Sequence, residues 1–394
     1  MKSVIYVGMD VHSKTVSLCA YKPEKEWFGH QCEIETSSKL IWKYAQKLLA
    51  EQGEPGDTLV FGYEAGCLGF YLAQELLDMG LDCRVMAPTT IRTAAVDRVR
   101  KTDRRDAKSL AKALAFSGYN EVHIPDQQDL DIREYIRMRE DTQQKVKENK
   151  QQINALLLKH GIRYSEGKSK WTIAHRKWLR EIKLSELERE TLNEYLMTLE
   201  ELEAKVERFD QRTTELSNQE RYKKTVDALS CFKGITRPIA MRIISEIGDF
   251  SRFKTAGEFA SYLGLTPSSH SSGEKDMKGA ITKMGNNHVR KTLVEATQSA
   301  TKGVPGRKSK ALKKRQEGND AKVIHYADKG NTRIVLKFKR MMEEGKNRNT
   351  AIIACAREMA CFIWGMATGK IEDRVYQSVS EQPFDSLTCE ILSA

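Results

Sequence analysis

The first 117 residues carry strand-type and helix-type runs in a fixed order, and that order most constrains the fold. Three strands are predicted first, at residues 3–9, 15–21 and 27–34, because β-branched and aromatic residues cluster there between polar turns. Helices and strands then alternate, over residues 38–51, 58–63, 67–78, 83–87 and 103–117. The βαβ units in this series would place parallel strands side by side, with their carboxyl ends at one edge.

Three leading strands followed by alternating helices and strands match a ribonuclease-H-like arrangement. Asp10 ends the first strand, Glu64 ends the strand after the first helix, and Asp103 and Asp106 begin the last helix. Ligands of open α/β sheets gather at the carboxyl edge, and four carboxylates there would repel one another without a cation. With no His or Cys expected nearby, oxygen ligands indicate Mg²⁺ or Mn²⁺. Taken singly, each acid is more often a helix cap or a surface charge.

The first strand has a second interpretation. Gly8-Met9-Asp10-Val11-His12 followed by a hairpin also resembles the phosphate loop of actin-like and sugar kinases, which share this type of sheet. Such kinases would need Gly-rich adenosine and phosphate loops further along the chain. No convincing ones follow in this sequence, so the kinase hypothesis rests on fold analogy alone.

Residues 127–225 have a different pattern, almost without Gly and Pro. Apolar residues recur there in steps of three or four, as at Leu196, Leu199, Leu202, Val206 and Phe209. We expect two long helices around a break near 161–170, forming an antiparallel coiled-coil hairpin, although a plain helical spacer would show the same pattern. Because helices of this kind often bury their stripe on a second subunit, the sequence favours a homo-oligomer.

The remaining chain contains three notable segments. Residues 226–250 predict a helix, a turn at Gly234 and a second helix, whose start could hold a phosphate or form an ordinary corner. The Ser/Gly run between Tyr262 and Gly273 could present a nucleophilic serine, but its residues alone favour a flexible loop. Residues 302–348 carry fifteen Lys and Arg against five Asp and Glu, and an apolar helix is expected to follow at 350–368.

The composition narrows the class of protein. A net charge of +11 and a pI near 9.1 favour nucleic acid or another anionic partner. The eight cysteines include no C-x-x-C pair, which is typical of reduced thiols in an intracellular protein. No apolar stretch is expected to be long enough to span a bilayer, and the first residues show no signal-peptide pattern. The expected compartment is the cytoplasm of a bacterial or archaeal cell.

Several separated motifs, in this order, resemble the DEDD transposases of insertion-sequence family one-ten, relatives of the Piv/MooV DNA invertases. The resemblance covers roughly residues 3–120 and 225–300. The motifs are Gly8-Met9-Asp10-Val11-His12, Glu64-Ala65-Gly66, Lys101-Thr102-Asp103-Arg104-Arg105-Asp106-Ala107, Glu246-Ile247-Gly248-Asp249-Phe250, Tyr262-Leu263-Gly264-Leu265-Thr266-Pro267 and Ser272-Gly273.

The resemblance implies an α/β plus α fold in four parts. A RuvC-like, RNase H-like catalytic domain would occupy residues 1–125, and a coiled-coil dimerisation region residues 126–225. A mainly helical transposase domain with the nucleophile and the basic segment would occupy 226–372, followed by a tail at 373–394. Asp10, Glu64, Asp103 and Asp106 would hold Mg²⁺, and Ser272, with Ser271 as the alternative, would attack DNA and form a covalent link.

The implied partners are donor and target DNA and a noncoding bridge RNA encoded by the element, with a dimer or tetramer of the chain. The metal domain and the serine domain of different subunits would build a composite site. A junction resolvase using water, or a nucleic-acid-binding scaffold without activity, remain alternatives. The basic residues expected at nucleic acid are Arg100, Lys101, Arg104, Arg105, Lys283, Arg290, Arg307, Lys308, Lys310, Lys313, Lys314 and Arg315.

Overall fold

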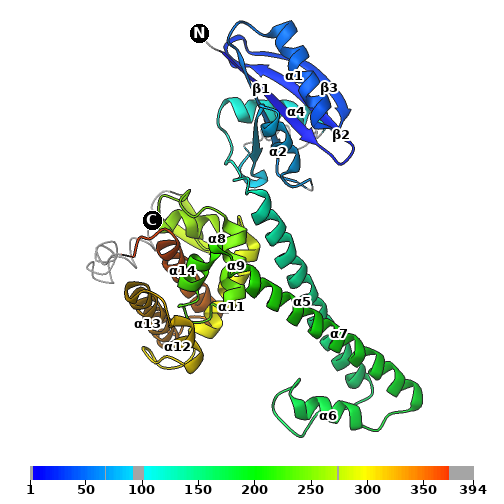
Figure 1. Cartoon of the computed structure of the whole chain (residues 1–394), viewed down its shortest axis with the longest axis vertical. Coiled ribbons are helices and arrows are strands. Elements are labelled where there is room, and N and C mark those ends of the chain that lie inside the picture. Colours follow the sequence, from blue (N-terminus) through cyan, green and yellow to red (C-terminus); the bar gives the residue numbers. More distant parts are fainter. Residues whose placement is uncertain (1–2, 67, 92–101, 273–274, 372–394) are drawn as a thin grey trace. The chain divides into compact units, whose positions relative to one another are not determined.

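A computed structural model describes residues 3–66, 68–91, 102–272 and 275–371 of the chain (Figure 1). The chain divides into two compact units, Met1–Asp126 and Gln127–Ala394. Each unit has its own hydrophobic core. The expected tail at 373–394 lies outside the described residues.

The first unit is a five-stranded sheet with helices on both faces. The strand order is β3-β2-β1-β4-β5. β1 pairs antiparallel with β2 and parallel with β4, and β5 continues the parallel part. This arrangement confirms the expected α/β fold. The elements are β1 (Val4–Val11), β2 (Thr15–Lys22), β3 (Trp27–Glu35), α1 (Ser38–Gln52), β4 (Thr58–Glu64), α2 (Tyr71–Asp78), β5 (Asp82–Met86) and α4 (Asp103–Ala115), with short 3₁₀ turns at Pro23–Lys25 and Pro88–Thr90.

Successive side chains along each strand point to opposite faces of the sheet, and both faces are packed against helices. In β1, Ile5, Val7 and Met9 are fully buried against the core that α1 and α2 complete. Val4 and Tyr6 point to the other face and pack with Leu110 and Leu114 of α4. Residues of one strand two apart share a face, so Asp10 belongs to the α4 face together with Gly8.

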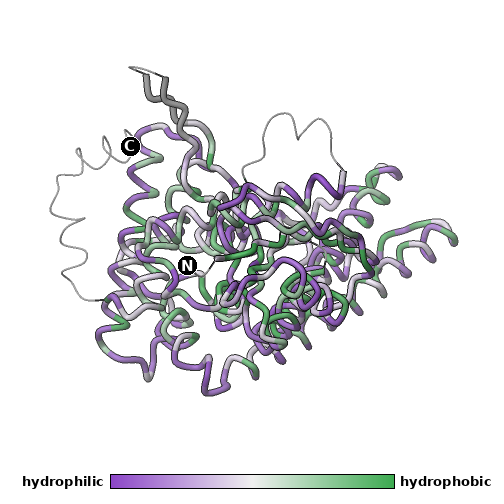
Figure 2. The backbone as a smooth tube through the Cα atoms, turned by 90° about the horizontal axis from the view of Figure 1, so that it is seen from above, coloured by the Kyte–Doolittle hydropathy of each residue, from purple (hydrophilic) through white to green (hydrophobic). Residues whose placement is uncertain are grey.

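The second unit is helical except for one hairpin. Its elements are α5 (Gln127–Lys159), α6 (Ile173–Glu181), α7 (Glu186–Leu216), α8 (Glu220–Leu229), α9 (Arg237–Ile247), α10 (Ala256–Tyr262), β6 (Pro267–Ser272), β7 (Lys275–Ile281), α11 (Asn287–Ala300), α12 (Lys310–Gln316), α13 (Ala321–Glu343) and α14 (Arg348–Ala367). Hydrophilic and hydrophobic residues alternate along most helices (Figure 2), as amphipathic packing requires. The expected helix pair around the Gly234 turn is present as α8 and α9.

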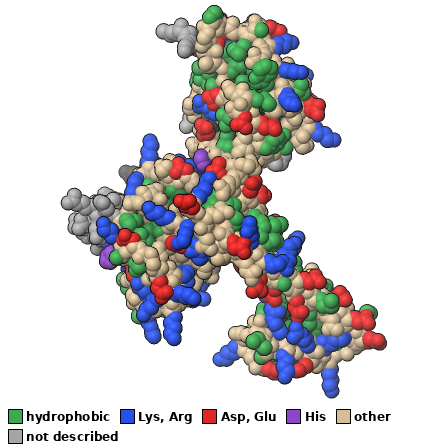
Figure 3. Space-filling view, in the orientation of Figure 1, with side chains coloured by type: hydrophobic (Ala, Val, Ile, Leu, Met, Phe, Trp, Pro, Cys, Tyr) green, Lys and Arg blue, Asp and Glu red, His purple; other side chains and the backbone are tan. Residues whose placement is uncertain are grey.

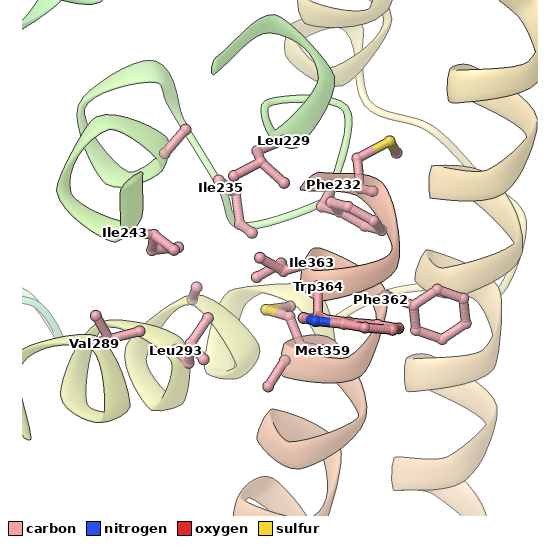
Figure 4. Packing of buried hydrophobic residues seen from close by; sticks show 14 of the residues in the cluster. Leu229, Phe232, Ile235, Ile243, Val289, Leu293, Met359, Phe362, Ile363 and Trp364 are labelled. Carbon is pink, nitrogen blue, oxygen red and sulfur yellow. The ribbon is translucent and has the colours of Figure 1, made fainter. Parts of the chain in front are cut away.

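α14 is the central helix of the larger core. Met359, Phe362, Ile363 and Trp364 from α14 meet side chains of α8, α9 and α11 there, together with Phe232 of the turn between α8 and α9 (Figure 4). The 20 residues of α14 have a mean hydropathy of 1.3 in their most apolar window, which is long and apolar enough to cross a membrane by length and composition alone. The expectation that no stretch reaches that length was therefore wrong, although 61% of the window is buried inside the protein.

α5 and α7 are the two long helices expected in the middle of the chain, and they pack against each other. Val146, Ile153 and Leu157 of α5 meet Leu192 and Leu199 of α7 in a separate small core. The connection is longer than the break expected near 161–170, because it contains α6 and its own aromatic side chains. The stretch up to residue 225 also turns once more, since α7 ends at Leu216 and α8 begins at Glu220.

The Ser/Gly run is not the flexible loop that its residues favoured. It forms the β6–β7 hairpin, in which Ser271 pairs with Asp276 and Ser272 with Lys275. Thr266 and Pro267 begin the hairpin, and the backbone N–H of Thr282 donates to the carbonyl of Thr266 at its base. The backbone pairing of β6 with β7 gives this segment a regular structure. Its high content of Ser and Gly alone did not indicate this pairing.

Candidate functional site

α4 lies unusually close to the sheet because two glycines face it. Gly8 in β1 and Gly62 in β4 are paired neighbours in the parallel ladder. A Cβ added at Gly8 would lie 2.1 Å from the carbonyl oxygen of Ala107 and 2.3 Å from the backbone nitrogen of Ala111. The backbone of α4 therefore rests directly on β1, which holds the first turn of α4 beside the end of the strand.

This contact brings together three side chains that can bind a metal. His12 Nε2 lies 3.4 Å from Asp10 Oδ2 and 3.7 Å from Asp103 Oδ1. In the described part of the chain, the ligand atoms of Asp10, His12 and Asp103 form the group that lies within 4.8 Å of one another. Two carboxylates and an imidazole are a suitable donor set for a divalent cation.

The presence of His12 corrects the expectation that no histidine lies near the acids. His12 follows Asp10 by two residues, just past the end of β1. The backbone N–H of His12 donates to the carbonyl of Thr15, and its own carbonyl accepts from the Thr36 hydroxyl. These bonds fix the turn that carries the imidazole. The i, i+2 spacing of Asp10 and His12 was the sequence signal that could have identified it.

The other two acids lie near this group without joining it. Glu64 is the exposed last residue of β4, one position beyond the Met9–Tyr63 pair of the parallel ladder, so it lies level with Asp10. Asp106 is half-buried, one helical turn after Asp103. The structure thus gathers Asp10 and Asp103, adds His12, and leaves Glu64 and Asp106 outside the 4.8 Å group.

Basic side chains surround the start of α4. Arg104 and Arg105 are exposed, whereas Arg100 and Lys101 lie outside the described residues. Further along the same helix, Lys108 places its Nζ 4.2 Å from the centre of the Phe28 ring. The acids of this edge are therefore accompanied by cations suited to a polyanion.

The serine segment belongs to the second unit. Ser271 and Ser272 are the last two residues of β6, and their side chains lie outside the described part. The Arg290 guanidinium donates to the carbonyls of Leu263 and Met284, which flank the hairpin. Arg290 is thus engaged in holding the hairpin base, while Lys283 beside it is exposed.

A buried carboxylate connects the hairpin to α5, and sequence reasoning did not single out its role. Glu246 of α9 receives hydrogen bonds from Arg137 at 2.8 and 3.1 Å and from the Asn286 amide at 2.8 Å. Asn286 also caps α11, through its side-chain oxygen and the Val289 N–H. Burial alone would raise the pKa of Glu246, but the hydrogen bonds from Arg137 and Asn286 lower it below its ordinary value.

The basic segment at 302–348 is folded into α12 and α13. Some of its cations are used inside the unit: Lys308 pairs with Asp328, and Arg315 donates to the carbonyl of Ser230. Arg333 and Lys337 both pair with Glu358 of α14. The remaining candidates from this segment are exposed, namely Arg307, Lys310, Lys313 and Lys314.

Comparisons with known proteins match two separate parts of the chain to transposase families. A DEDD transposase family model matches residues 7–162, and a model of the transposase IS116/IS110/IS902 family matches residues 226–312. The first match contains all four acids, and the second contains the β6–β7 hairpin.

Relatives match most of the chain. A Sinorhizobium fredii protein, y4qE, whose name marks it as a transposase, is 31% identical over 92% of this chain and 88% of its own length. The transposase for insertion sequence element IS1533 of Leptospira borgpetersenii is 28% identical over 88% of this chain and 99% of its own. Two separate family models and a relative matched over most of both chains agree, so the chain belongs to the IS110 family of DEDD transposases.

Proposed function

We propose that this transposase cuts and rejoins DNA strands through a covalent serine–DNA intermediate, assisted by Mg²⁺ at the acids of the first unit. The observation that carries the proposal is the approach of Asp10 and Asp103 from β1 and α4, with His12 between them. Two carboxylates this close to each other can both stay ionised at neutral pH when a cation balances their charge.

The acids would hold the metal, and each residue has a distinct part. Asp10 and Asp103 would be direct ligands, and His12 would be a third. Glu64 and Asp106 would complete the set, since Glu64 lies level with Asp10 and Asp106 lies one helical turn after Asp103. A bound divalent cation stabilises negative charge on the attacking and leaving oxygens of a phosphodiester.

The serine would provide the nucleophile. Its Oγ forms a new bond to phosphorus, one existing P–O ester bond breaks, and the leaving deoxyribose hydroxyl takes up a proton. The reverse attack by a DNA hydroxyl breaks the serine–phosphorus bond and restores the serine. Because one phosphoester replaces another, strands can be cut and rejoined without ATP. Ser272 is the proposed nucleophile and Ser271 the alternative.

The basic side chains would position nucleic acid without choosing its sequence. Arg104 and Arg105 in the first unit, and the exposed Lys and Arg of α12 in the second, would contact phosphates. Sequence choice would come from base pairing with an element-encoded bridge RNA. The family resemblance supports this role of RNA, and the net charge of +11 is compatible with both nucleic acids.

The four expected parts of the chain also define a proposed division of labour. Residues 1–125 would supply the metal site, 126–225 the dimerising coiled coil, and 226–372 the serine. We propose that the acids and the serine of one active site come from different subunits of a dimer or tetramer. A protein that acts on chromosomal DNA in a bacterial or archaeal cell would work in the cytoplasm.

The experiment is to trap the protein on a donor-end DNA substrate with Mg²⁺ and RNA from the same element, and to detect protein–DNA adducts on a denaturing gel. The wild type should form an adduct. Ser272→Ala and Asp10→Ala should not form one, because each removes an essential part of the site.

Two outcomes would contradict the serine mechanism. Cleavage that persists in both Ser272→Ala and Ser271→Ala without an adduct would indicate hydrolysis by water, as in a junction resolvase. Tight binding with no cleavage under any metal or RNA condition would indicate a nonenzymatic scaffold.

A further inference from the structure

The connection between α5 and α7 is far longer than a helical hairpin needs. Two to five residues join most antiparallel helix pairs, whereas here the chain runs from Lys159 to Glu186 and builds α6 on the way. We call residues 159–185 the distal lobe. It lies at the end where α5 stops and α7 begins (Figure 1).

The distal lobe has a defined internal packing. His175 is almost fully buried and stacks on Trp178, with ring centres 5.6 Å apart. Tyr164 and Trp171 meet its ring edge-on, and the backbone N–H of Trp171 donates to His175 Nδ1 at 3.2 Å. Leu179 is fully buried and joins the core shared with α5 and α7. The lobe is therefore a small folded unit packed against the α5–α7 helix pair.

The charge of the distal lobe is opposite to that of the helix that follows it. Residues 159–183 contain eight Lys and Arg against two Glu, whereas α7 contains ten Asp and Glu against four Lys and Arg. Lys and Arg side chains gather around α6 in the space-filling view (Figure 3). A predominantly basic surface on a small lobe attracts a polyanion.

Two of these cations are fixed by α7. Arg176 Nη2 lies 2.8 Å from Glu203, and Arg180 Nη2 lies 2.5 Å from Glu200. Lys150 of α5 also pairs with Glu203, at 2.7 Å. These ion pairs hold α6 against the α5–α7 helix pair and neutralise part of the acidic surface of α7.

Four other cations have no such function. In the described part of the chain, the exposed side chains of Lys159, Arg163, Lys168 and Lys183 form no hydrogen bond or ion pair. Free Lys and Arg side chains on a rigid support are what phosphate contacts require. Three of them precede α6 in the chain, and Lys183 follows it.

We propose that the distal lobe is a nucleic-acid-backbone contact, with Lys159, Arg163, Lys168 and Lys183 bound to phosphates. A second copy of the chain is the other polyanionic candidate, through the acids of α7. The pairing of Glu200 and Glu203 within the same chain favours nucleic acid over that copy. The contact uses none of the residues proposed for the metal and serine sites, so it stands or falls independently of the chemistry proposed there.

The test uses full-length protein carrying Ser272→Ala, so that binding is measured without cleavage. The lobe variant changes Lys159, Arg163, Lys168 and Lys183 to Glu. The matched control changes four exposed cations of α5 and α7 outside the lobe to Glu, namely Lys145, Lys147, Lys205 and Arg208. Both variants alter the net charge equally, and circular dichroism checks that both remain folded.

Binding is measured by fluorescence anisotropy over a range of salt, with a 40-base-pair DNA duplex and a hairpin RNA of similar length as probes. Each lost phosphate contact on duplex DNA lowers the slope of log K against log salt by about 0.9. Relative to the parent protein, the magnitude of this slope should fall by about 3–4 in the lobe variant on at least one probe, and by less than about 1 in the control. The probe that loses slope identifies the nucleic acid. A variant in which each Lys of the set is changed to Arg and Arg163 is changed to Lys keeps the charge, so it should bind both probes as the parent protein does.

Equal losses in the lobe variant and the control would overturn the proposal, since net charge alone would explain them. Unchanged slopes on both probes in the lobe variant would also overturn it. If that variant sedimented as a smaller oligomer as well, the lobe would contact a second copy.

Discussion

His12 changes the chemistry expected of the metal site at the scale of single residues. Carboxylates alone favour Mg²⁺, whereas an imidazole nitrogen adds affinity for transition metals. With Nε2 within 3.7 Å of both Asp10 and Asp103, the imidazole can bind the same ion. The presence of His12 can therefore shift the preference of the site from Mg²⁺ toward a transition metal such as Mn²⁺.

We predict that His12→Ala lowers the affinity for Mn²⁺ by about 10-fold or more and changes the affinity for Mg²⁺ much less. Thermal shift titrations with each metal measure both affinities. His30→Ala is the control, since His30 lies beside Glu51 instead of the acids of the site. Equal Mn²⁺ affinity in His12→Ala and the wild type would show that His12 is no ligand.

Glu246 provides a second prediction at this scale. It is 3% exposed and lies against the buried Arg133 and the partly exposed Arg137, so Glu246→Ala removes a carboxylate that balances two guanidinium groups. Removing one member of such a group costs about 3–5 kcal/mol. Urea unfolding should show this loss, whereas Glu190→Ala at an exposed position of α7 should change stability by less than about 0.5 kcal/mol.

The same carboxylate sets a pH dependence. The pKa of Glu246 is lowered from 4.5 in the folded protein, so its stabilising contribution is complete above pH 4.5 and disappears as the pH falls through the folded value. The urea midpoint of the wild type should drop in that range, and the difference from Glu246→Ala should shrink. A constant difference down to the acid-unfolding point would contradict this assignment.

At the scale of elements, the contact between α4 and β1 decides whether the acids meet. Gly8→Ala would place a methyl group 2.1 Å from the Ala107 carbonyl oxygen, and the backbone of α4 cannot rotate away as a side chain would. Overpacking of this kind costs about 1–3 kcal/mol and moves Asp103 from Asp10. We predict that Gly8→Ala lowers both the melting temperature and metal affinity.

Gly118→Ala provides the matched control, because the nearest atom to its added Cβ is 3.9 Å away. Metal affinity measured by calorimetry should be unchanged in this variant. If Gly8→Ala retained full metal affinity, the close approach of α4 would not be what positions the acids.

The element order of the first unit was predictable from sequence because alternation and turn residues determine it locally. The strands, their ends and the start of α4 at Asp103 followed from such patterns. The addition of His12 to the group depended on the exact end of β1. The approach of Asp103 to Asp10 and His12 depended on the contact of Gly8 with α4, which joins residues about 100 apart in the chain. The order of the serine hairpin likewise comes from cross-strand pairing and from Arg290, and no local pattern encodes such contacts.

At the scale of the whole molecule, the proposed acids and the proposed serine belong to different compact units. If one active site combines units from two subunits, a mixture of two inactive variants should regain function. We predict that Asp10→Ala mixed with an equal amount of Ser272→Ala recovers roughly a quarter of wild-type adduct, because half of random dimers are mixed and each has one intact site. A mixture as inactive as its components would place both groups in one subunit.

The central claim is that a serine of the β6–β7 hairpin attacks DNA with the help of the acids at the end of β1. Mass spectrometry of protease-digested adducts, formed with Mg²⁺, DNA and element RNA, tests it most directly. The account predicts a nucleotide on the peptide containing Ser272, present in the wild type and absent in Asp10→Ala. A nucleotide on a residue outside the hairpin, or cleaved DNA with no modified peptide, would contradict it.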